Sequence, residues 1–485
     1  MGAEPAVAGT GPGVVGPPEP VSNHGAGLPR GLANVPRSSV ERGRYGRMFR
    51  TLKPYAPTDK TLRRLAVSML PPPPTGPSPT PAPPIQPGEN PDIPAGYTYV
   101  GQFVDHDITF DPSSVLQRRN DPDAIVNYRT PRFDLDSIYG AGPDDQPFLY
   151  DRDDPWKLLI GRNRGKDEER EDLPRNAQGR ALIGDPRNDV HVILTHLTLA
   201  FLRFHNAVVD HLRAKHVPDA ELFAEAQRVT RWHYQWVVVE DFLRRTVGAD
   251  VLRQVLVEEP GGGRRADLKY YAWKNDPFMP VEFSAAAYRF GHSQIRSTYV
   301  LKTGMLPLHI MVPFDNADPL EHLTGFRPLP KGWKIQWDLY FTIAGSRPQL
   351  SRRIDARLTG PLGSLPVSID SGRRAMAILD MLRGRSLGLP SGEAVAAAIG
   401  TTRHDLGLKD QTPLWYYILK EAEVDNGGLR LGPTGATIVA EVLVGLLAGD
   451  PSSYLRVAPT WTPELPSEVP GQFTMADILR FAGVA

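Results

Sequence analysis

The stretch VHVILTHLTLAFLRFHNAVVDHLR, residues 190–213, decides the fold of this chain. Its apolar residues recur every three to four positions, around Val192, Leu199, Phe204 and Val208, which is the period of an α-helix with a buried face. The stretch therefore predicts a long core helix, and the rest of the chain can be interpreted around it.

The helical period continues along the chain. Residues 220–246, 370–385, 391–399 and 433–449 also predict helices, and alternating strand patterns are few. We therefore expect a mainly α fold, with few short strands, in one large domain over residues 41–485.

Two segments are too poor in apolar residues to contribute to the core. Residues 1–40 are rich in Gly, Pro and Ala and predict a flexible tail, and the Pro-rich stretch 71–94 predicts an extended connector on the surface. No secretory signal and no run of about 18 apolar residues is visible, so we expect no membrane span, and the compartment stays open.

Composition excludes several kinds of site. Lys plus Arg (55) equals Asp plus Glu (55), so no net field indicates a nucleic-acid or membrane partner. Cysteine is absent, which excludes disulfides, thiolate-bound metals and Cys nucleophiles. A transition metal must therefore be held by His, carboxylate, Tyr or Met.

The motif GYTYVGQFVDHDITFDP (96–112) combines a histidine with two carboxylates. In a helix, Gln102 and His106 share a face, whereas Asp105 and Asp107 point elsewhere. A capped helix with a hydrogen-bonded core histidine is the plainer interpretation. Burying three ionisable groups nevertheless costs free energy unless each has a partner.

The motif TPRFDLDSIYG (130–140) presents oxygen ligands at Thr130, Asp134 and Asp136. A hard cation such as Ca²⁺ requires such ligands, although the central Gly and terminal Glu of an EF-hand loop are missing. The alternative is a surface turn followed by a strand.

Two further motifs each carry one candidate residue. In GDPRNDVH (184–191), turn-forming neighbours can hold Arg187 rigidly, or it is a solvated residue at a helix start. In YRFGHSQIR (288–296), His292 can bind a metal through a neutral imidazole nitrogen, or it is a hydrogen-bonded core histidine.

The last motif, ILDMLRGRSLGLPSG (378–392), places Asp380 and Arg383 one helical turn apart. By itself this spacing also fits an ordinary ion pair at a helix end. Each motif is weak singly, and their order along the chain carries more information than any one of them.

Taken together, the motifs resemble those of the animal-type haem peroxidases, the peroxidase–cyclooxygenase superfamily, and look most like its bacterial members. The matching stretches, in the family's order over roughly residues 45–450, are GQFVDHD (101–107), DLDSIYG (134–140), GDPR (184–187), RFGH (289–292) and LRGRSLGLP (382–390). The resemblance implies an enzyme that reduces hydrogen peroxide. It would oxidise a small donor such as iodide, thiocyanate or a phenol through a ferryl intermediate.

On the distal side of the haem, the resemblance assigns three roles. His106 would take a proton from peroxide and return it to the departing oxygen. Gln102 would help to hold water or halide, and the charge of Arg187 would stabilise the charge that develops as the O–O bond cleaves.

On the proximal side, the resemblance makes His292 the ligand of the haem iron. Arg289 and Arg383 would pair with haem propionates or support the proximal side. Asp380 stands where the family usually has Asn. A carboxylate there would give the imidazole more imidazolate character, lower the reduction potential and favour donors easier to oxidise than chloride.

The resemblance also implies a structural calcium ion. Its ligands would be Asp107, Thr130, Asp134 and Asp136, together with the backbone carbonyl of Arg132. The ion would tie the distal helix to a separate loop and so fix the neighbouring histidine.

The chain departs from the family at the covalent links to haem. Asp105 occupies one ester position, but Val190 stands at the other and His191 at the position of a sulfonium-forming Met. We therefore expect haem b with at most one ester link.

Two other functions are compatible with parts of the pattern. A haem-dependent fatty-acid dioxygenase needs a tyrosine three residues before the proximal histidine, where this chain has Arg289, and Tyr288 lies one residue further back. A non-catalytic haem or calcium scaffold would need His106 and Arg187 to be inert.

Overall fold

The computed structural model describes most of the chain. The described residues are 43–71, 88–111, 120–162, 171–312, 318–365, 375–406 and 411–485. The tail predicted at 1–40 and most of the predicted Pro-rich connector lie outside them.

The expected mainly α fold is confirmed. The longer helices are α1 (Asp59–Ser68), α2 (Gly96–Ile108), α4 (Val192–Ala214), α5 (Asp219–Trp236), α9 (Met376–Ser386), α10 (Gly392–Ile399), α11 (Leu414–Asn426) and α12 (Pro433–Gly449). The shorter ones are α3 (Asp136–Tyr139), α6 (Arg244–Val247), α7 (Ala249–Val255), α8 (Val281–Ser284), α13 (Tyr454–Val457) and α14 (Met475–Phe481). The 3-10 helices Pro186–Asp189 and Ala287–Gln294 carry the candidate residues Arg187 and His292.

The predicted helices are present within the described residues. The helix expected at 370–385 is α9, which begins at Met376, and residues 370–374 lie outside the described residues. The helix expected at 220–246 is α5 followed by a π-helical segment, Val237–Leu243, and then α6. The end of the motif 130–140, where the alternative was a turn followed by a strand, forms the short helix α3. The helices α1, α7, α8, α11, α13 and α14 were not predicted.

The strands are short and pair in small sheets. They are β1 (Gly43–Gly46), β2 (Glu89–Pro94), β3 (Val126–Asn127), β4 (Gly161–Arg162), β5 (Glu171–Asp172), β6 (Leu256–Glu258), β7 (Arg264–Ala266), β8 (Met279–Pro280), β9 (Thr298–Tyr299), β10 (Leu308–His309) and β11 (Leu350–Arg352). The largest sheet among the described residues has the order β3-β1-β8.

One part of the predicted connector is wrong. Residues 89–94 do not lie loosely on the surface, because they form β2, which pairs antiparallel with β11. Glu89 is buried there in an ion pair with Arg296, and Asn90 is fully buried. Proline is tolerated in such a two-stranded pair because only one edge of the strand needs its N–H groups.

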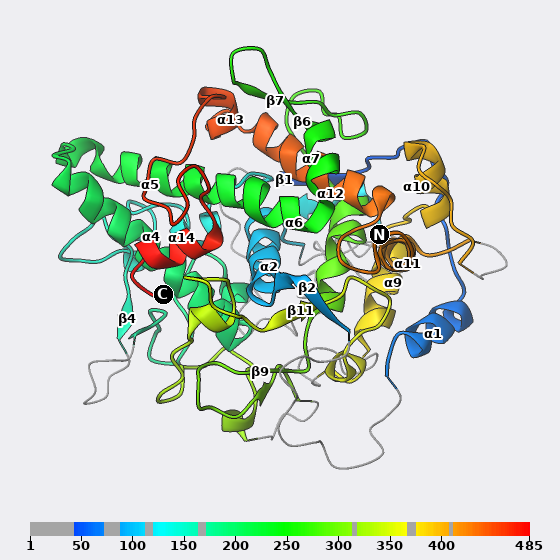
Figure 1. Ribbon diagram of the computed structural model, residues 1–485, viewed down its shortest axis with the longest axis horizontal. Helices are drawn as coiled ribbons and strands as arrows, with labels where there is room; N and C mark the ends of the chain where they lie inside the picture. The colour runs from blue at the N-terminus through cyan, green and yellow to red at the C-terminus, as the bar shows by residue number, and fades with distance from the viewer. Residues whose placement is uncertain are drawn as a thin grey trace, which may run out of the picture.

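Helix α2 lies near the middle of the molecule, with α5 and α6 above it in the view and α9 and α11 to its right (Figure 1). It packs against α4, against the π-helical segment and against the 3-10 helix Ala287–Gln294. The Phe103 ring of α2 stacks on Phe201 of α4 with centroids 4.5 Å apart. Because α2 is held on several sides, its side chains occupy fixed positions in the core.

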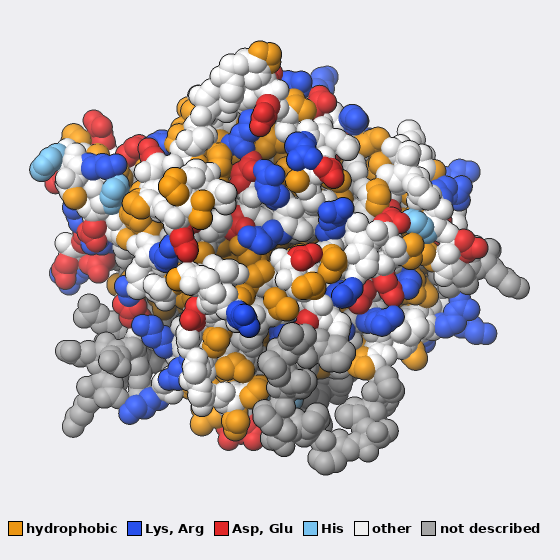
Figure 2. Space-filling model, viewed as in Figure 1, with side chains coloured by type: hydrophobic (Ala, Val, Ile, Leu, Met, Phe, Trp, Pro, Cys, Tyr) orange, Lys and Arg blue, Asp and Glu red, His pale blue; other side chains and the backbone are white. Residues whose placement is uncertain are grey.

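Helix α4 is the one described helix that is both long and apolar enough to cross a membrane, but 83% of its most apolar stretch is buried inside the protein. Its composition is therefore accounted for by its place in the core. On the face shown in Figure 2, positive and negative side chains are interspersed, in keeping with the equal numbers of basic and acidic residues.

Candidate active site

His106 lies near the C-terminal end of α2 and is 7% exposed. Its Nδ1 lies 2.8 Å from the side-chain oxygen of Asn188, and because that oxygen only accepts, Nδ1 carries the proton. Burial, with a further contribution from the nearby charge of Arg187, lowers the pKa of His106 to about 3. The ring is therefore neutral near pH 7, and Nε2 is a free base.

Asn188 was not predicted as a site residue. It lies in the 3-10 helix Pro186–Asp189, which Asp185 caps by accepting the backbone N–H of Arg187 at 2.8 Å. The amide nitrogen of Asn188 is buried and has no hydrogen-bond partner among the residues that the structure describes. The only signal in the sequence was its position directly after the predicted distal arginine.

The side chain of Arg187 is more constrained than the sequence indicated. Its Nη2 donates to the backbone carbonyls of His106 (3.0 Å) and Thr109 (2.6 Å) and forms an ion pair with Asp185 (2.7 Å). Burial alone would raise the pKa of Asp185, but the charges of Arg129 and Arg187 outweigh it and hold that pKa well below its usual range. Arg187 thus binds the C-terminal end of α2, a helix end that favours cations, while Asp185 balances its charge.

Gln102 shares a face of α2 with His106, as predicted, and has a partner that was not predicted. Its side-chain oxygen lies 2.7 Å from Nε2 of His191, the residue that caps the N-terminus of α4. Two histidines, His106 and His191, therefore lie near this face of α2 rather than one.

His292 lies in the 3-10 helix Ala287–Gln294, and its Nδ1 is 2.7 Å from a carboxylate oxygen of Asp380 on α9. The other oxygen of this fully buried carboxylate accepts a hydrogen bond from Nη1 of Arg289 at 3.0 Å. The pairing of Asp380 with the imidazole agrees with the expectation. Of the two roles expected for Arg289, its bond to Asp380 favours support of His292, whose Nδ1 faces the same carboxylate. In the neutral ring with its proton on Nδ1, Nε2 is the nitrogen that would bind a metal.

A cavity of about 60 Å³ is lined by residues from the two segments that carry His106 and His292. Among its lining residues are the polar side chains of Asp105, Asp111, Arg187, Arg289 and Arg383 and the apolar side chains of Tyr45, Phe110, Ile125, Val281 and Leu387. The wall carries Asp105, the neighbour of His106, and Arg289, which precedes His292 by three positions, rather than the two rings themselves.

Tyr288 does not belong to this wall. Its ring stacks on Phe283 with centroids 4.6 Å apart and meets Phe242 edge-on at 6.3 Å. Its buried hydroxyl has no hydrogen-bond partner and lies near Gly101 of α2. The side chain thus packs between helices.

The predicted calcium ligands converge. Carboxylate oxygens of Asp107, Asp134 and Asp136 lie within 4.8 Å of one another, and Thr130 donates a 2.6 Å hydrogen bond to Asp134. One carboxylate oxygen of Asp136 is buried without a partner. Arg132 lies in the same loop. The cluster therefore joins α2 to the loop before α3, as the sequence predicted.

The three carboxyl groups of this cluster have raised pKa values, so a bound cation would stabilise their charged forms. Burial, the largest cause, raises the pKa of all three carboxyls, and the charges of Asp134 and Asp136 raise that of Asp107 further. Arg129, 3.3 Å from Asp136, offsets only part of this, and the pKa of Asp136 still reaches about 7. One buried and two half-buried carboxylates, with Arg129 near Asp136 and Arg231 near Asp134, offer the oxygen donors that Ca²⁺ prefers.

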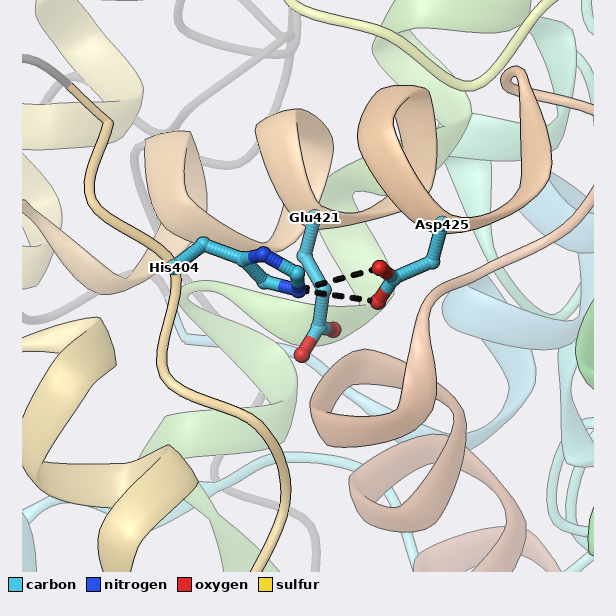
Figure 3. Close-up of side chains that lie close together, drawn as sticks. All are labelled: His404, Glu421 and Asp425. Atoms are coloured by element: carbon cyan, nitrogen blue, oxygen red, sulfur yellow. Dashed lines mark hydrogen bonds and ion pairs between the residues drawn. The ribbon is translucent and has the colours of Figure 1, made fainter.

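His404, Glu421 and Asp425 form a second group whose ligand atoms lie within 4.8 Å of one another (Figure 3). In Figure 3 the Asp425 carboxylate points at the His404 ring, with Nε2 and Oδ1 3.0 Å apart. The Glu421 carboxylate instead accepts backbone N–H groups of Thr434 and Gly435 at the start of α12. These contacts, a loop tie and a helix cap, account for all three side chains without a metal.

Comparison with known proteins agrees with this geometry. The animal haem peroxidase family model matches residues 114–405, which include Arg187, His292 and Asp380. Heme peroxidase 2 of Caenorhabditis elegans is 24% identical over 324 residues, 61% of this chain and 44% of the relative. Thyroid peroxidase of Sus scrofa is 25% identical over 378 residues, 68% of this chain and 38% of the relative. The chain thus spans about two-fifths of the length of these curated relatives.

Solved structures share the fold. Peroxidase A from Dictyostelium discoideum superimposes with a TM-score of 0.57 at 14% identity, covering 89% of this chain and 88% of that one. The fatty acid alpha-dioxygenase of Oryza sativa gives a TM-score of 0.52 at 16% identity, covering 82% and 74%. At these identities the likeness shows the fold alone, so the family assignment depends on the family model, which matches more than half of the chain. The chain belongs to the animal haem peroxidase family.

Proposed function

We propose that this chain is a haem peroxidase that reduces hydrogen peroxide and oxidises a second, small donor. The observation that carries the proposal is that two remote segments, each with a histidine, line one cavity. Asn188 faces Nδ1 of His106 and Asp380 faces Nδ1 of His292, so in each neutral ring the lone pair lies on Nε2. One is suited to be a base and the other a metal ligand.

The residues around the cavity fit haem. His292 would bind the iron, Arg383 would pair with a propionate, and Asp105 is placed on the wall for at most one ester link. The partnerless buried amide of Asn188 agrees with a polar occupant that completes the site. When bound, haem supplies the redox-active iron at which peroxide is reduced and the donor is oxidised.

The distal residues handle the proton. Nε2 of His106 accepts a proton from peroxide and later delivers it to the leaving oxygen, while Asn188 keeps the ring in the tautomer that this task needs. Arg187 holds the end of α2 through two backbone carbonyls and so fixes the histidine. Its charge, although balanced by Asp185, is poised on the cavity wall to stabilise developing negative charge.

The proximal side bears on the choice of donor. The Asp380 carboxylate makes His292 a stronger electron donor to the iron, which favours donors such as iodide, thiocyanate or phenols over chloride. Arg289 shares the same carboxylate and therefore moderates the effect.

We also propose that Asp107, Thr130, Asp134 and Asp136, with the carbonyl of Arg132, hold a structural calcium ion. The convergence of the three carboxylates and the partnerless oxygen of Asp136 support it. Because Asp107 directly follows the distal histidine, the ion would fix that histidine to the loop.

The test is reconstitution of the purified chain with hemin. We expect a Soret band that His292→Ala abolishes or shifts, and a spectral change on adding peroxide that iodide or guaiacol reverses. His106→Leu should retain the Soret band but react with peroxide at least about a hundredfold more slowly. A chain that takes up no hemin, or a His106→Leu variant as reactive as the wild type, would refute the proposal.

The dioxygenase alternative has less support. Its radical tyrosine would have to be Tyr288, whose ring is stacked between helices and does not line the cavity. An oxygen-uptake assay with palmitic acid separates the two functions.

A further inference from the structure

The distal side contains two pairs of an imidazole and a primary amide. His106 pairs with Asn188 at 2.8 Å, and His191 pairs with Gln102 at 2.7 Å. In an imidazole–amide pair, a ring nitrogen that carries a proton binds the amide oxygen, and one without a proton binds the NH₂ group. The protonation of that nitrogen therefore decides which end of the amide is left for other partners. The second pair therefore bears on what Gln102 can offer to a ligand.

The tautomer of His191 is determined by its backbone surroundings. Its Nδ1 accepts the backbone N–H of Leu194 at 3.2 Å, so this nitrogen carries a lone pair. His191 is the N-cap of α4, with extended φ and ψ of −156° and 158°. In the neutral ring, the proton therefore resides on Nε2, which faces Gln102.

His191 is held firmly in this orientation. It is 8% exposed, and the ring of Tyr99 meets it edge-on with centroids 4.8 Å apart. Its backbone forms a bridge to Thr324, and the next residue, Val192, donates to the carbonyl of Leu323 at 2.8 Å. The His191 side chain thus keeps one conformation, and its Nε2–H is a donor with a fixed direction.

A fixed donor determines the orientation of the Gln102 amide. Nε2–H of His191 donates to the side-chain oxygen of Gln102, and a flipped amide would place its NH₂ group against this N–H. We propose that His191 is a positioning residue, which holds Gln102 so that its NH₂ group, and not its oxygen, serves the distal side of the haem. The inference rests on the proposed function.

The arrangement gives the distal side two complementary groups. Gln102 precedes His106 by one turn on the same face of α2, so a donor and a base lie next to each other. A peroxide that loses a proton to Nε2 of His106 leaves an oxygen with added negative charge, which an NH₂ donor stabilises. Small anions that accept hydrogen bonds, such as fluoride, should benefit in the same way.

The test uses fluoride binding to the ferric protein, measured by absorption. His191→Asn preserves the N-cap of α4, because Asn is among the best N-cap residues, but it is too short to reach Gln102. We expect an unchanged melting temperature and a fluoride Kd about three- to tenfold higher, the effect of one neutral hydrogen bond. His196→Asn is the matched control. His196 is a buried histidine of the same helix, bonded to the carbonyl of Val192, and its replacement should leave the fluoride Kd unchanged.

A second measurement needs no haem. In the full chain with ¹⁵N-labelled histidine, the His191 signals, assigned with His191→Asn, should be those of the Nε2–H tautomer. An Nδ1–H tautomer, or a fluoride Kd that His191→Asn leaves at the wild-type value, would overturn the inference. Failure to take up hemin would instead refute the proposed function, and the tautomer measurement would still decide whether His191 fixes the amide.

Discussion

The proximal carboxylate offers the sharpest test of the electrostatics. Asp380 accepts from His292 at 2.7 Å and from Arg289 at 3.0 Å and is fully buried, so both of these neighbours draw on its charge. Replacing it with Asn removes the charge but keeps an oxygen that can still accept from either side chain. We expect Asp380→Asn to raise the ferric/ferrous reduction potential of the haem-loaded protein.

The magnitude follows from the strength of the bond that is weakened. A hydrogen bond to a charged group contributes about 1.5–3 kcal/mol, against about 1 kcal/mol for a neutral one. For a one-electron couple about 1.4 kcal/mol corresponds to 59 mV, so the difference of about 0.5–2 kcal/mol would be about 20–85 mV. Because Arg289 already takes part of the charge, we expect a shift in the lower half of this range, about 20–50 mV.

A matched variant should shift the potential the other way. Arg289→Gln removes the competing positive charge while its amide can still donate to Asp380, so more of the carboxylate charge reaches the imidazole and the potential falls. Spectroelectrochemical titration measures both variants, with circular dichroism as the control for folding. The reasoning is refuted if Asp380→Asn leaves the potential unchanged or if both variants shift it in the same direction.

Three further predictions concern proton transfer, calcium and the haem link. The rate of reaction with peroxide should not change between about pH 5 and 8. Burial and Arg187 lower the pKa of His106 to about 3, so the basic form of the ring persists throughout this range. Stopped-flow rates with an inflection near pH 6.5 assigned to His106 would contradict this. Calcium removal with EGTA should lower the melting temperature more at pH 8 than at pH 5. Without the ion, the folded state binds a proton at Asp136, whose pKa is raised from 3.8 to about 7. The stability of the ion-free folded state therefore falls as the pH rises from about 4 to about 7. Calorimetry that shows equal effects of EGTA at both pH values would argue against this prediction. Acidified acetone should release all haem from Asp105→Asn, and retained haem would contradict the expectation of at most one ester link, at Asp105. Haem that leaves the wild type freely would rule out the ester at Asp105.

Local pattern and motif order allowed much of the fold to be predicted. The 3.6-residue period of 190–213 predicted α4 because a helix with one buried face must repeat its apolar residues at that spacing. The spacing of Gln102 and His106 placed both on one face of α2 for the same reason. Composition misled at 89–94, where a Pro-rich sequence concealed a strand whose partner, β11, lies far along the chain.

The sequence by itself determined which elements form, which residues share a face and which motifs occur together. The family resemblance had already paired Asp380 with His292. Only the tertiary structure decided the other partners: His106 with Asn188, His191 with Gln102, and Asp380 with Arg289, pairs separated by 82, 89 and 91 positions. The physical reason is that periodicity constrains contacts within about one turn, whereas a hydrogen bond between remote segments depends on how whole helices pack. The tautomers, and with them the division of the site into base, donor and ligand, follow from that packing.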